Sequence, residues 1–153
     1  MEEYIQDKLS NLLNALGVEF NHIDIQEGKN LSEENQYMIN IATSEASLLI
    51  GKKGNNIIAL QHILKQLMKK KFPTLRINLD VDSYKKRQIE NTLGITERHV
   101  QKVRESHKTV SLPPMTPYYR RIVHIFIDRN YPDILTESAG LKEGRHVILK
   151  PKA

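Results

Sequence analysis

The chain has 153 residues, of which 39% are hydrophobic and 27% charged, values typical of a soluble globular protein with one domain or two small modules. It contains no cysteine, which excludes disulfides, thiol nucleophiles and cysteine-based zinc modules. No apolar run reaches the roughly 18–20 residues of a membrane span. The acidic start also differs from a secretory signal peptide, so we expect a cytoplasmic protein that is not itself inserted into a membrane.

The charge is divided unevenly along the chain. Residues 1–50 hold two basic and nine acidic side chains, a net of −7, whereas residues 51–153 hold 21 basic and nine acidic ones, a net of +12. Net charge reports on partners rather than on fold. The basic part therefore suggests a polyanion-binding face, with an ordinary solvated basic surface as the alternative.

The first half of the chain predicts the order helix, strand, strand, helix, helix, strand. Hydrophobic spacing places these elements at residues 4–16, 18–26, 37–41, 44–50 (capped by Ser44), 55–71 and 75–81. The apolar positions slip by one residue between Phe20 and Ile23, which predicts a bulge in the first strand. Polar residues 27–36 predict the turn that follows it, and Leu67 is expected on the apolar face of the long helix.

The second half predicts the order helix, strand, helix, strand, strand. The elements are a long charged helix from Ser83 with Gly94 as a weak point, a short strand near 110–112, a helix over 117–129 with Pro117 as its first residue, and strands over 134–138 and 145–150. Asp80 and Asp82 are predicted to cap the long helix with Ser83 rather than to bind a metal. The whole pattern predicts an α+β protein of two compact modules, residues 1–82 and 83–153.

The sequence Gly51-Lys52-Lys53-Gly54 separates the short helix from the long one that follows it. Glycines allow the backbone to approach a sugar-phosphate chain that a Cβ would obstruct. The amides of a turn that opens a helix favour an anion, and the two lysines attract phosphate whatever the base. The loop is therefore a candidate clamp for a nucleic-acid backbone, with a basic turn that only connects two helices as the alternative.

Apolar and basic residues beside this loop extend the interpretation. Ile50, Ile57 and Ile58 are predicted to form a shallow floor for unstacked bases. The run Lys69–Lys71 either extends the basic surface or, as cations at the end of a helix, stabilises the helix dipole.

The element order resembles a type II K-homology (KH) domain over about residues 1–82. The most specific part of the resemblance is Leu48–Gly54 between the two central helices, followed by Ala59–Gln61 in the second of them. In that domain the GxxG loop holds the backbone of about four nucleotides of single-stranded RNA. The resemblance implies that residues 51–54 make these backbone contacts.

Arg120 and His124 lie four residues apart, on one face of the predicted helix 117–129. Arginine offers a planar fork of donors to phosphate, and histidine can donate to phosphate or stack on a base without being a catalyst. The adjacent Arg121 is a further candidate for phosphate contact. A solvated or capped pair is the alternative when these residues are considered alone.

The second half of the chain resembles an R-three-H domain, which is named for the Arg-x-x-x-His spacing and binds single-stranded nucleic acid. The resemblance lies in segments 112–115, 120–124, 136–138 and 145–151. A type II KH domain followed by this domain resembles the bacterial Jag family (SpoIIIJ-associated protein) over nearly the whole chain. The resemblance implies that Arg120, Arg121 and His124 contact nucleic acid. Tyr119 departs from the family pattern, in which an acidic residue usually precedes the arginine pair. Many members also carry an N-terminal domain thought to engage membrane-insertion or envelope machinery, and we do not expect that role to follow for this chain.

The remaining chemistry-bearing residues form no recognisable site. The six histidines lie on different predicted elements without a metal-binding spacing, and no serine-nucleophile motif is present, so we expect no metal, no cofactor and no catalytic residue. We therefore expect a non-enzymatic protein that binds single-stranded RNA, or single-stranded DNA, with modest sequence preference, because phosphate contacts carry no base identity. The resemblance implies a post-transcriptional or cell-envelope regulator in bacteria. The alternatives are a protein-interaction adaptor that uses the acidic helix at the N-terminus, and a nucleic-acid-processing enzyme.

Overall fold

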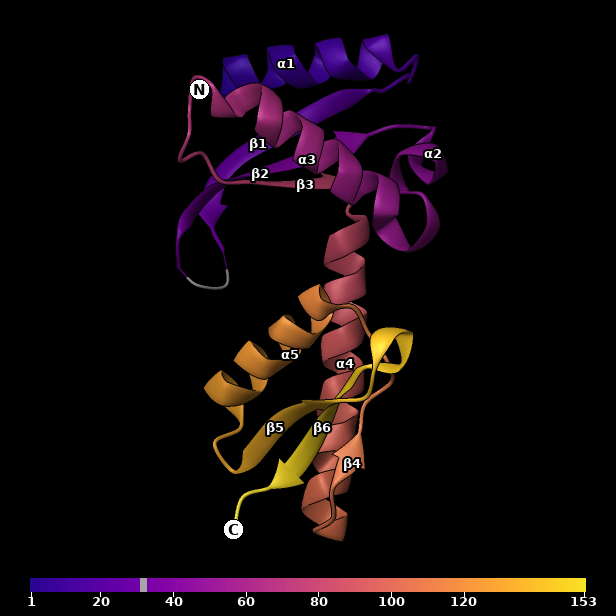
Figure 1. The fold of residues 1–153 in the computed structure, drawn as a ribbon, viewed down its shortest axis with the longest axis vertical. Helices are drawn as coiled ribbons and strands as arrows, with labels where there is room; N and C mark the ends of the chain where they lie inside the picture. The colour runs from indigo at the N-terminus through magenta and orange to yellow at the C-terminus, as the bar shows by residue number, and fades with distance from the viewer. Residues whose placement is uncertain (31–32) are drawn as a thin grey trace. The chain divides into compact units, whose positions relative to one another are not determined.

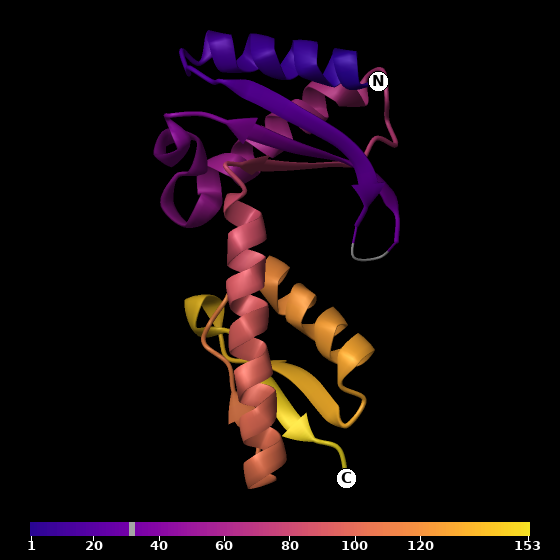
Figure 2. The same ribbon diagram turned by 180° about the vertical axis from the view of Figure 1, so that it is seen from behind.

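The computed structural model describes residues 1–30 and 33–153, which divide into two compact units, Met1–Lys86 and Arg87–Ala153. Figures 1 and 2 show the course of the chain from two opposite sides. Each unit contains one three-stranded sheet, and the elements follow the order predicted from the sequence. The α+β class is therefore confirmed.

The first unit places two long helices on one face of its sheet (Figure 1). The strand order is β1-β2-β3, with β1 antiparallel to β2 and β2 parallel to β3. The elements are α1 (Glu2–Ala15), β1 (His22–Lys29), β2 (Asn35–Ala42), α2 (Ala46–Ile50), the short 3-10 turn η1 (Lys52–Gly54), α3 (Asn55–Lys69) and β3 (Ile77–Val81). The GxxG sequence thus lies between α2 and α3, as predicted.

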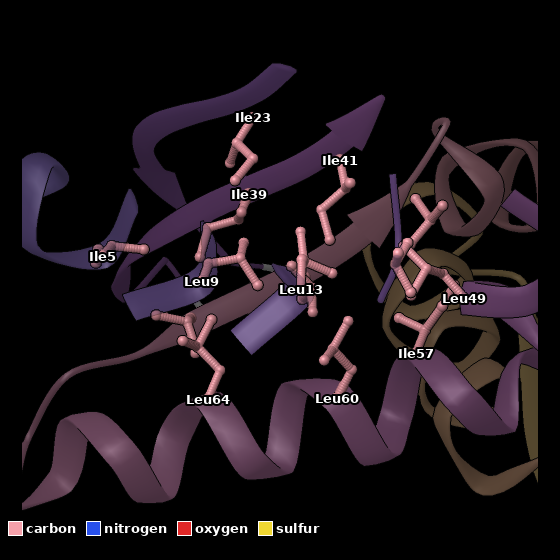
Figure 3. Packing of buried hydrophobic residues seen from close by; sticks show 14 of the residues in the cluster. Ile5, Leu9, Leu13, Ile23, Ile39, Ile41, Leu49, Ile57, Leu60 and Leu64 are labelled. Carbon is pink, nitrogen blue, oxygen red and sulfur yellow. The ribbon is translucent and has the colours of Figure 1, made fainter. Parts of the chain in front are cut away.

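The core of the first unit forms where the apolar stripes of the helices meet alternate strand residues. Figure 3 shows Leu9 and Leu13 of α1 between the sheet and α3. The buried partners on the strands and α3 include Ile23, Ile39, Ile41, Ile57, Leu60 and Leu64. Each such side chain contributes about 1.5–3 kcal/mol through burial. Leu67, which we predicted on this face, is 47% exposed, because Met68 takes the next core position after Leu64 and turns Leu67 toward solvent.

The β1–β2 hairpin differs from the prediction in two respects. Its register runs without interruption from His22 opposite Ala42 to Lys29 opposite Asn35, so the predicted bulge is wrong. Val18 is buried before the strand begins, which accounts for the slip in the apolar pattern. Both strands also continue into residues 27–36, predicted as a turn, because cross-strand pairing satisfies the backbone of these polar residues. Residues 31–32 of that segment lie outside the described residues.

Ser44 does not cap α2, contrary to the prediction. Glu45 occupies the N-cap position, and Thr43 supports the turn instead. The Thr43 hydroxyl accepts a hydrogen bond from the Glu45 amide at 2.9 Å and donates to the Glu19 carbonyl. The buried Thr43 hydroxyl is thus hydrogen-bonded on both sides, and the N-cap falls one residue later than the sequence suggested.

Asp80 caps the start of α4 (Tyr84–Ser106). Its Oδ1 accepts from the Lys85 amide at 2.9 Å and its Oδ2 from the Lys86 amide at 3.2 Å. Asp82, which was predicted to share this role with Ser83, accepts the amide of Thr43 just after β2, and the backbone amide of Ser83 donates to Oδ1 of Asn40 on β2. The helix cap therefore comes from the strand that precedes it.

The second unit packs α4 and α5 against the sheet β4-β6-β5, in which both pairings are antiparallel. The elements after α4 are β4 (Val110–Ser111), α5 (Pro117–Asn130), β5 (Ile134–Ala139), the 3-10 turn η2 (Lys142–Gly144) and β6 (His146–Pro151). Helix α4 continues without a break through Gly94, and Pro117 begins α5 as predicted. The buried core comprises Val100, Val103, Leu112, Val123, Ile127, Ile134, Val147 and Leu149. Among the described residues, no helix is long and apolar enough to cross a membrane.

Candidate nucleic-acid interface

Three residues of the GxxG loop, two glycines and one lysine, have positive φ angles, which favour glycine. Gly51 and Gly54 have φ angles of 68° and 77°, which glycine adopts at little cost. Lys53 has a φ of 54°, and a left-handed conformation of a non-glycine residue costs about 1–2 kcal/mol. Lys52 and Lys53 are both exposed. The loop therefore holds two lysines at its tip on a strained backbone, a feature common at ligand sites.

Gly51 has no room for a side chain. A Cβ at this position would lie 2.4 Å from Cγ of Asn56. Asn56, in the first turn of α3, points back and donates from its Nδ2 to the Leu48 carbonyl at 2.8 Å. It therefore joins the end of α2 to the start of α3 beneath the loop. Sequence reasoning missed Asn56, since an asparagine just after a turn carries no signal of which carbonyl it will reach.

Gly54 is supported from another side by Tyr84. This glycine is buried, and a Cβ here would lie 3.2 Å from Cε1 of Tyr84, at the start of α4. The ring of a residue thirty positions later in the sequence thus limits what can stand at position 54. Tyr84 was also missed by the sequence reasoning.

The apolar surface beside the loop differs from the predicted floor. Ile57 is fully buried in the core, so its predicted place in the floor is wrong: α3 turns this position toward the sheet. Ile50 is half-buried. Ile58 is 60% exposed and Leu48 is 56% exposed, and these two residues carry the accessible apolar surface near the loop.

His124 in the second unit is turned from α5 onto strand β5. Its Nδ1 lies 2.7 Å from Oγ1 of Thr136 and its Nε2 lies 3.0 Å from Oγ of Ser138. Thr136 and Ser138 are two positions apart on one strand, so their hydroxyls share a face. Burial lowers the pKa of His124, and the nearby Arg120 lowers it further, against an opposite effect of Asp128. The neutral ring thus fastens α5 to β5 with both of its nitrogens engaged.

Arg120 is anchored to the segment that precedes its own helix. Its Nη1 donates to the Met115 carbonyl at 2.8 Å. A guanidinium has five N–H donors, so this single bond fixes the side chain and leaves donors for a ligand. Arg121 is exposed beside it. Tyr119, the departure from the family pattern, packs edge-on against Tyr118 with 5.2 Å between ring centroids.

Comparison with known proteins identifies both units. Residues 6–81 match the KH domain of KhpA/KhpB, and residues 90–151 match the R-three-H domain. The chain is 31% identical to RNA-binding protein KhpB of Clostridium symbiosum over 153 residues, which cover 99% of this chain and 68% of that protein. It is 29% identical to RNA-binding protein KhpB of Bacillus subtilis over 116 residues, which cover 73% of this chain and 55% of that protein.

The fold and both motifs thus define a protein in which a KH domain precedes an R-three-H domain. The chain belongs to the KhpB family, which confirms the resemblance to the Jag family, another name for these proteins. It is also 30% identical to RNA-binding protein KhpB of Lactiplantibacillus plantarum over 112 residues. The chain spans 34% of that relative and 55% of the Bacillus one, so the relatives contain sequence that has no counterpart in this match.

Proposed function

We propose that this chain binds single-stranded RNA, or single-stranded DNA, without catalysing a reaction on it. The observation that carries the proposal is the construction of the GxxG loop, in which two exposed lysines stand between glycines of positive φ. The printed names of the relatives, which describe RNA-binding proteins, support it. Residues 1–82 form the KH module of this proposal and residues 83–153 the R-three-H module.

In this mechanism the GxxG loop contacts the sugar-phosphate backbone of the nucleic acid and not its bases. Gly51 lets the loop close over the Asn56 side chain, which a Cβ would strike, and in this conformation Lys52 and Lys53 neutralise phosphates. Leu48 and Ile58 offer apolar surface to bases that have left a stack. Sequence preference is therefore modest, because most of these contacts are to phosphate.

The second module adds a weaker grip through the donor fork of Arg120 and the neighbouring Arg121. His124 acts here by holding α5 on β5 rather than by presenting a free nitrogen, because the hydroxyls of Thr136 and Ser138 occupy both of its ring nitrogens. Two weak sites on one chain bind the same RNA strand more tightly than either site alone. Once one site has bound the strand, the effective concentration of RNA at the other site is higher. The cellular role that fits this chemistry is post-transcriptional or cell-envelope regulation in a bacterium.

The adaptor alternative gains no support from helix α1. Its apolar residues Ile5, Leu9 and Leu13 are fully buried in the core of the first unit. They are therefore not free to dock another protein, and an adaptor role would have to use the exposed acidic residues Glu2, Glu3 and Asp7.

A salt series tests the proposal. The affinity for a short unstructured RNA is measured at several salt concentrations for the native chain and for Lys52→Asp/Lys53→Asp. If about four phosphates are contacted, the log–log slope lies near −3, and the double variant binds far more weakly. Lys8→Asp/Lys29→Asp is the control, because it makes the same charge change on α1 and β1, where each lysine already pairs with an acid. A flat salt response, or equal effects of both double variants, contradicts the proposal.

A further inference from the structure

Helix α3 carries a line of basic side chains that begins near the GxxG loop. His62, Lys65 and Lys69 are exposed and follow one another at spacings of three and four residues, so they lie along one face of the helix. We call these three residues the basic stripe. The sequence of α3 contains no aspartate or glutamate, so no acid within the helix offsets them.

Lys65 and Lys69 also have no ion-pair partner within the part of the chain that the structure describes. Cations in other parts of the chain form ion pairs with acids, as Arg76 does with Glu34 and Arg104 with Asp133. Among residues 1–30 and 33–153, no ion pair or hydrogen bond of the side chains of Lys52, Lys53, Lys65 or Lys69 is present. An uncompensated row of cations attracts a polyanion more strongly than paired ones do.

Lys85, beside the stripe, also forms no ion pair in the part of the chain that the structure describes. Its Nζ lies 3.2 Å from Oε1 of Gln61 and 3.4 Å from Oδ1 of Asn78, which are neutral oxygens. Burial lowers the pKa of Lys85 to about 8, Lys65 lowers it further, and Asp80 opposes both. The Asp80 carboxylate, however, already accepts three backbone N–H groups, those of Val81, Lys85 and Lys86. The Lys85 ammonium therefore has only neutral oxygens as its hydrogen-bond partners, and Asp80 offsets its charge from a distance.

We propose that the basic stripe is a phosphate-binding track that continues the grip of the GxxG loop along α3, so that the bound RNA strand is longer than the loop alone requires. This inference rests on the proposed function and extends it to the length of the ligand. Charge complementarity selects the occupant: Lys65 and Lys69 continue the positive charge of the loop lysines along a helix, and single-stranded nucleic acid is a linear array of phosphates.

The helix sets the scale of the track. From Gly54 to Lys69 the axis advances about 22 Å, at 1.5 Å per residue. At 3.4 Å per phosphate, the rise within one strand of a duplex, this length corresponds to about six nucleotides of a stacked strand, and to fewer when the strand is extended. Together with the about four nucleotides that a GxxG loop holds, the track gives a footprint of up to about ten nucleotides.

The test compares RNA length with charge removal in the intact chain. Affinities for oligouridylates of 4 and 12 nucleotides are measured across a salt series for the native chain, Lys65→Ala/Lys69→Ala, and the control Lys8→Ala/Lys29→Ala. We expect the stripe variant to bind the 4-mer like the native chain. For the 12-mer, its log–log salt slope is shallower by about 1.4, at 0.7 per lost contact. If the affinities converge at 1 M salt, this is a loss of about 25-fold at 0.1 M.

The outcomes separate this inference from the function it rests on. If Lys52→Asp/Lys53→Asp abolishes binding while the stripe variant keeps the native 12-mer slope, the track is refuted and the loop function stands. If neither variant changes RNA binding, both fail. If the stripe variant loses binding of polyglutamate but not of RNA, the track is refuted in favour of an acidic protein partner. Circular dichroism at the affinity-assay temperature confirms that each variant is folded.

Discussion

The half-buried Lys85 gives a stability prediction that can be worked out from its surroundings. Its pKa is about 8 in the folded chain against 10.5 ordinarily, with burial as the main cause. Between these two pH values the unfolded chain binds more protons than the folded one, so the free energy of unfolding rises as the pH rises through this range. Because one pKa unit corresponds to 1.36 kcal/mol, the gain is about 2–3 kcal/mol.

The substitution Lys85→Met removes the charge and keeps a side chain of similar length. We expect the unfolding free energy of this variant to lack the rise between pH 8 and 10. As the pH rises from 8 to 10, the unfolding free energy of the native chain therefore increases relative to that of Lys85→Met. Urea unfolding followed by circular dichroism at pH 7, 8, 9 and 10 measures it. Lys86→Met is the matched control, because Lys86 is exposed on the same helical turn. Parallel pH profiles for the native chain and Lys85→Met would refute the reasoning.

Two further substitutions test the two motifs. Gly51→Ala is expected to destabilise the chain more than Gly17→Ala and to weaken RNA binding. Both glycines have φ near 70°, but a Cβ at Gly17 meets nothing within 4 Å whereas one at Gly51 strikes Asn56. The shared φ cost is about 1–2 kcal/mol, and equal unfolding free energies for the two variants would contradict the role given to Asn56. For His124, the lowered pKa means that stability is lost as the pH falls below about 6.5, the ordinary pKa, because the unfolded chain then takes up a proton more readily. Thermal unfolding between pH 5 and 7 should show this loss in the native chain and not in His124→Gln; the same loss in both would assign it to another group.

The order of elements could be predicted because it depends on local periodicity. The apolar residues of α1 recur every three to four positions, and those of β2 and β3 recur every two. Each spacing therefore predicts both the type of element and the face that it buries. The predicted bulge in β1 failed for the opposite reason. Val18 is buried without being part of a strand, and burial alone produced the apolar signal.

Only those residues of the candidate site that are close together in the sequence could be predicted. The glycines and lysines of the loop are contiguous, so they were visible in the sequence. Asn56 and Tyr84 contact the loop through the fold, and Thr136 and Ser138 reach His124 from a different element. Such partners depend on tertiary distances, which residue spacing does not encode. For His124 the sequence predicted a donor to phosphate or a ring that stacks on a base, and it gave no sign of the two hydroxyls beside its ring nitrogens.

The side chain of Gln61 has a consequence for the edge of the first sheet. Among the described residues, strand β3 pairs only with β2, so its other edge is open to a further strand. The Oε1 of Gln61 accepts the Leu79 amide of this strand at 2.8 Å, in addition to the Lys85 ammonium. A foreign strand that approaches β3 therefore finds its central N–H group already bonded and a lysine side chain beside it. The same residues that border the basic stripe thus protect the sheet against edge-to-edge aggregation.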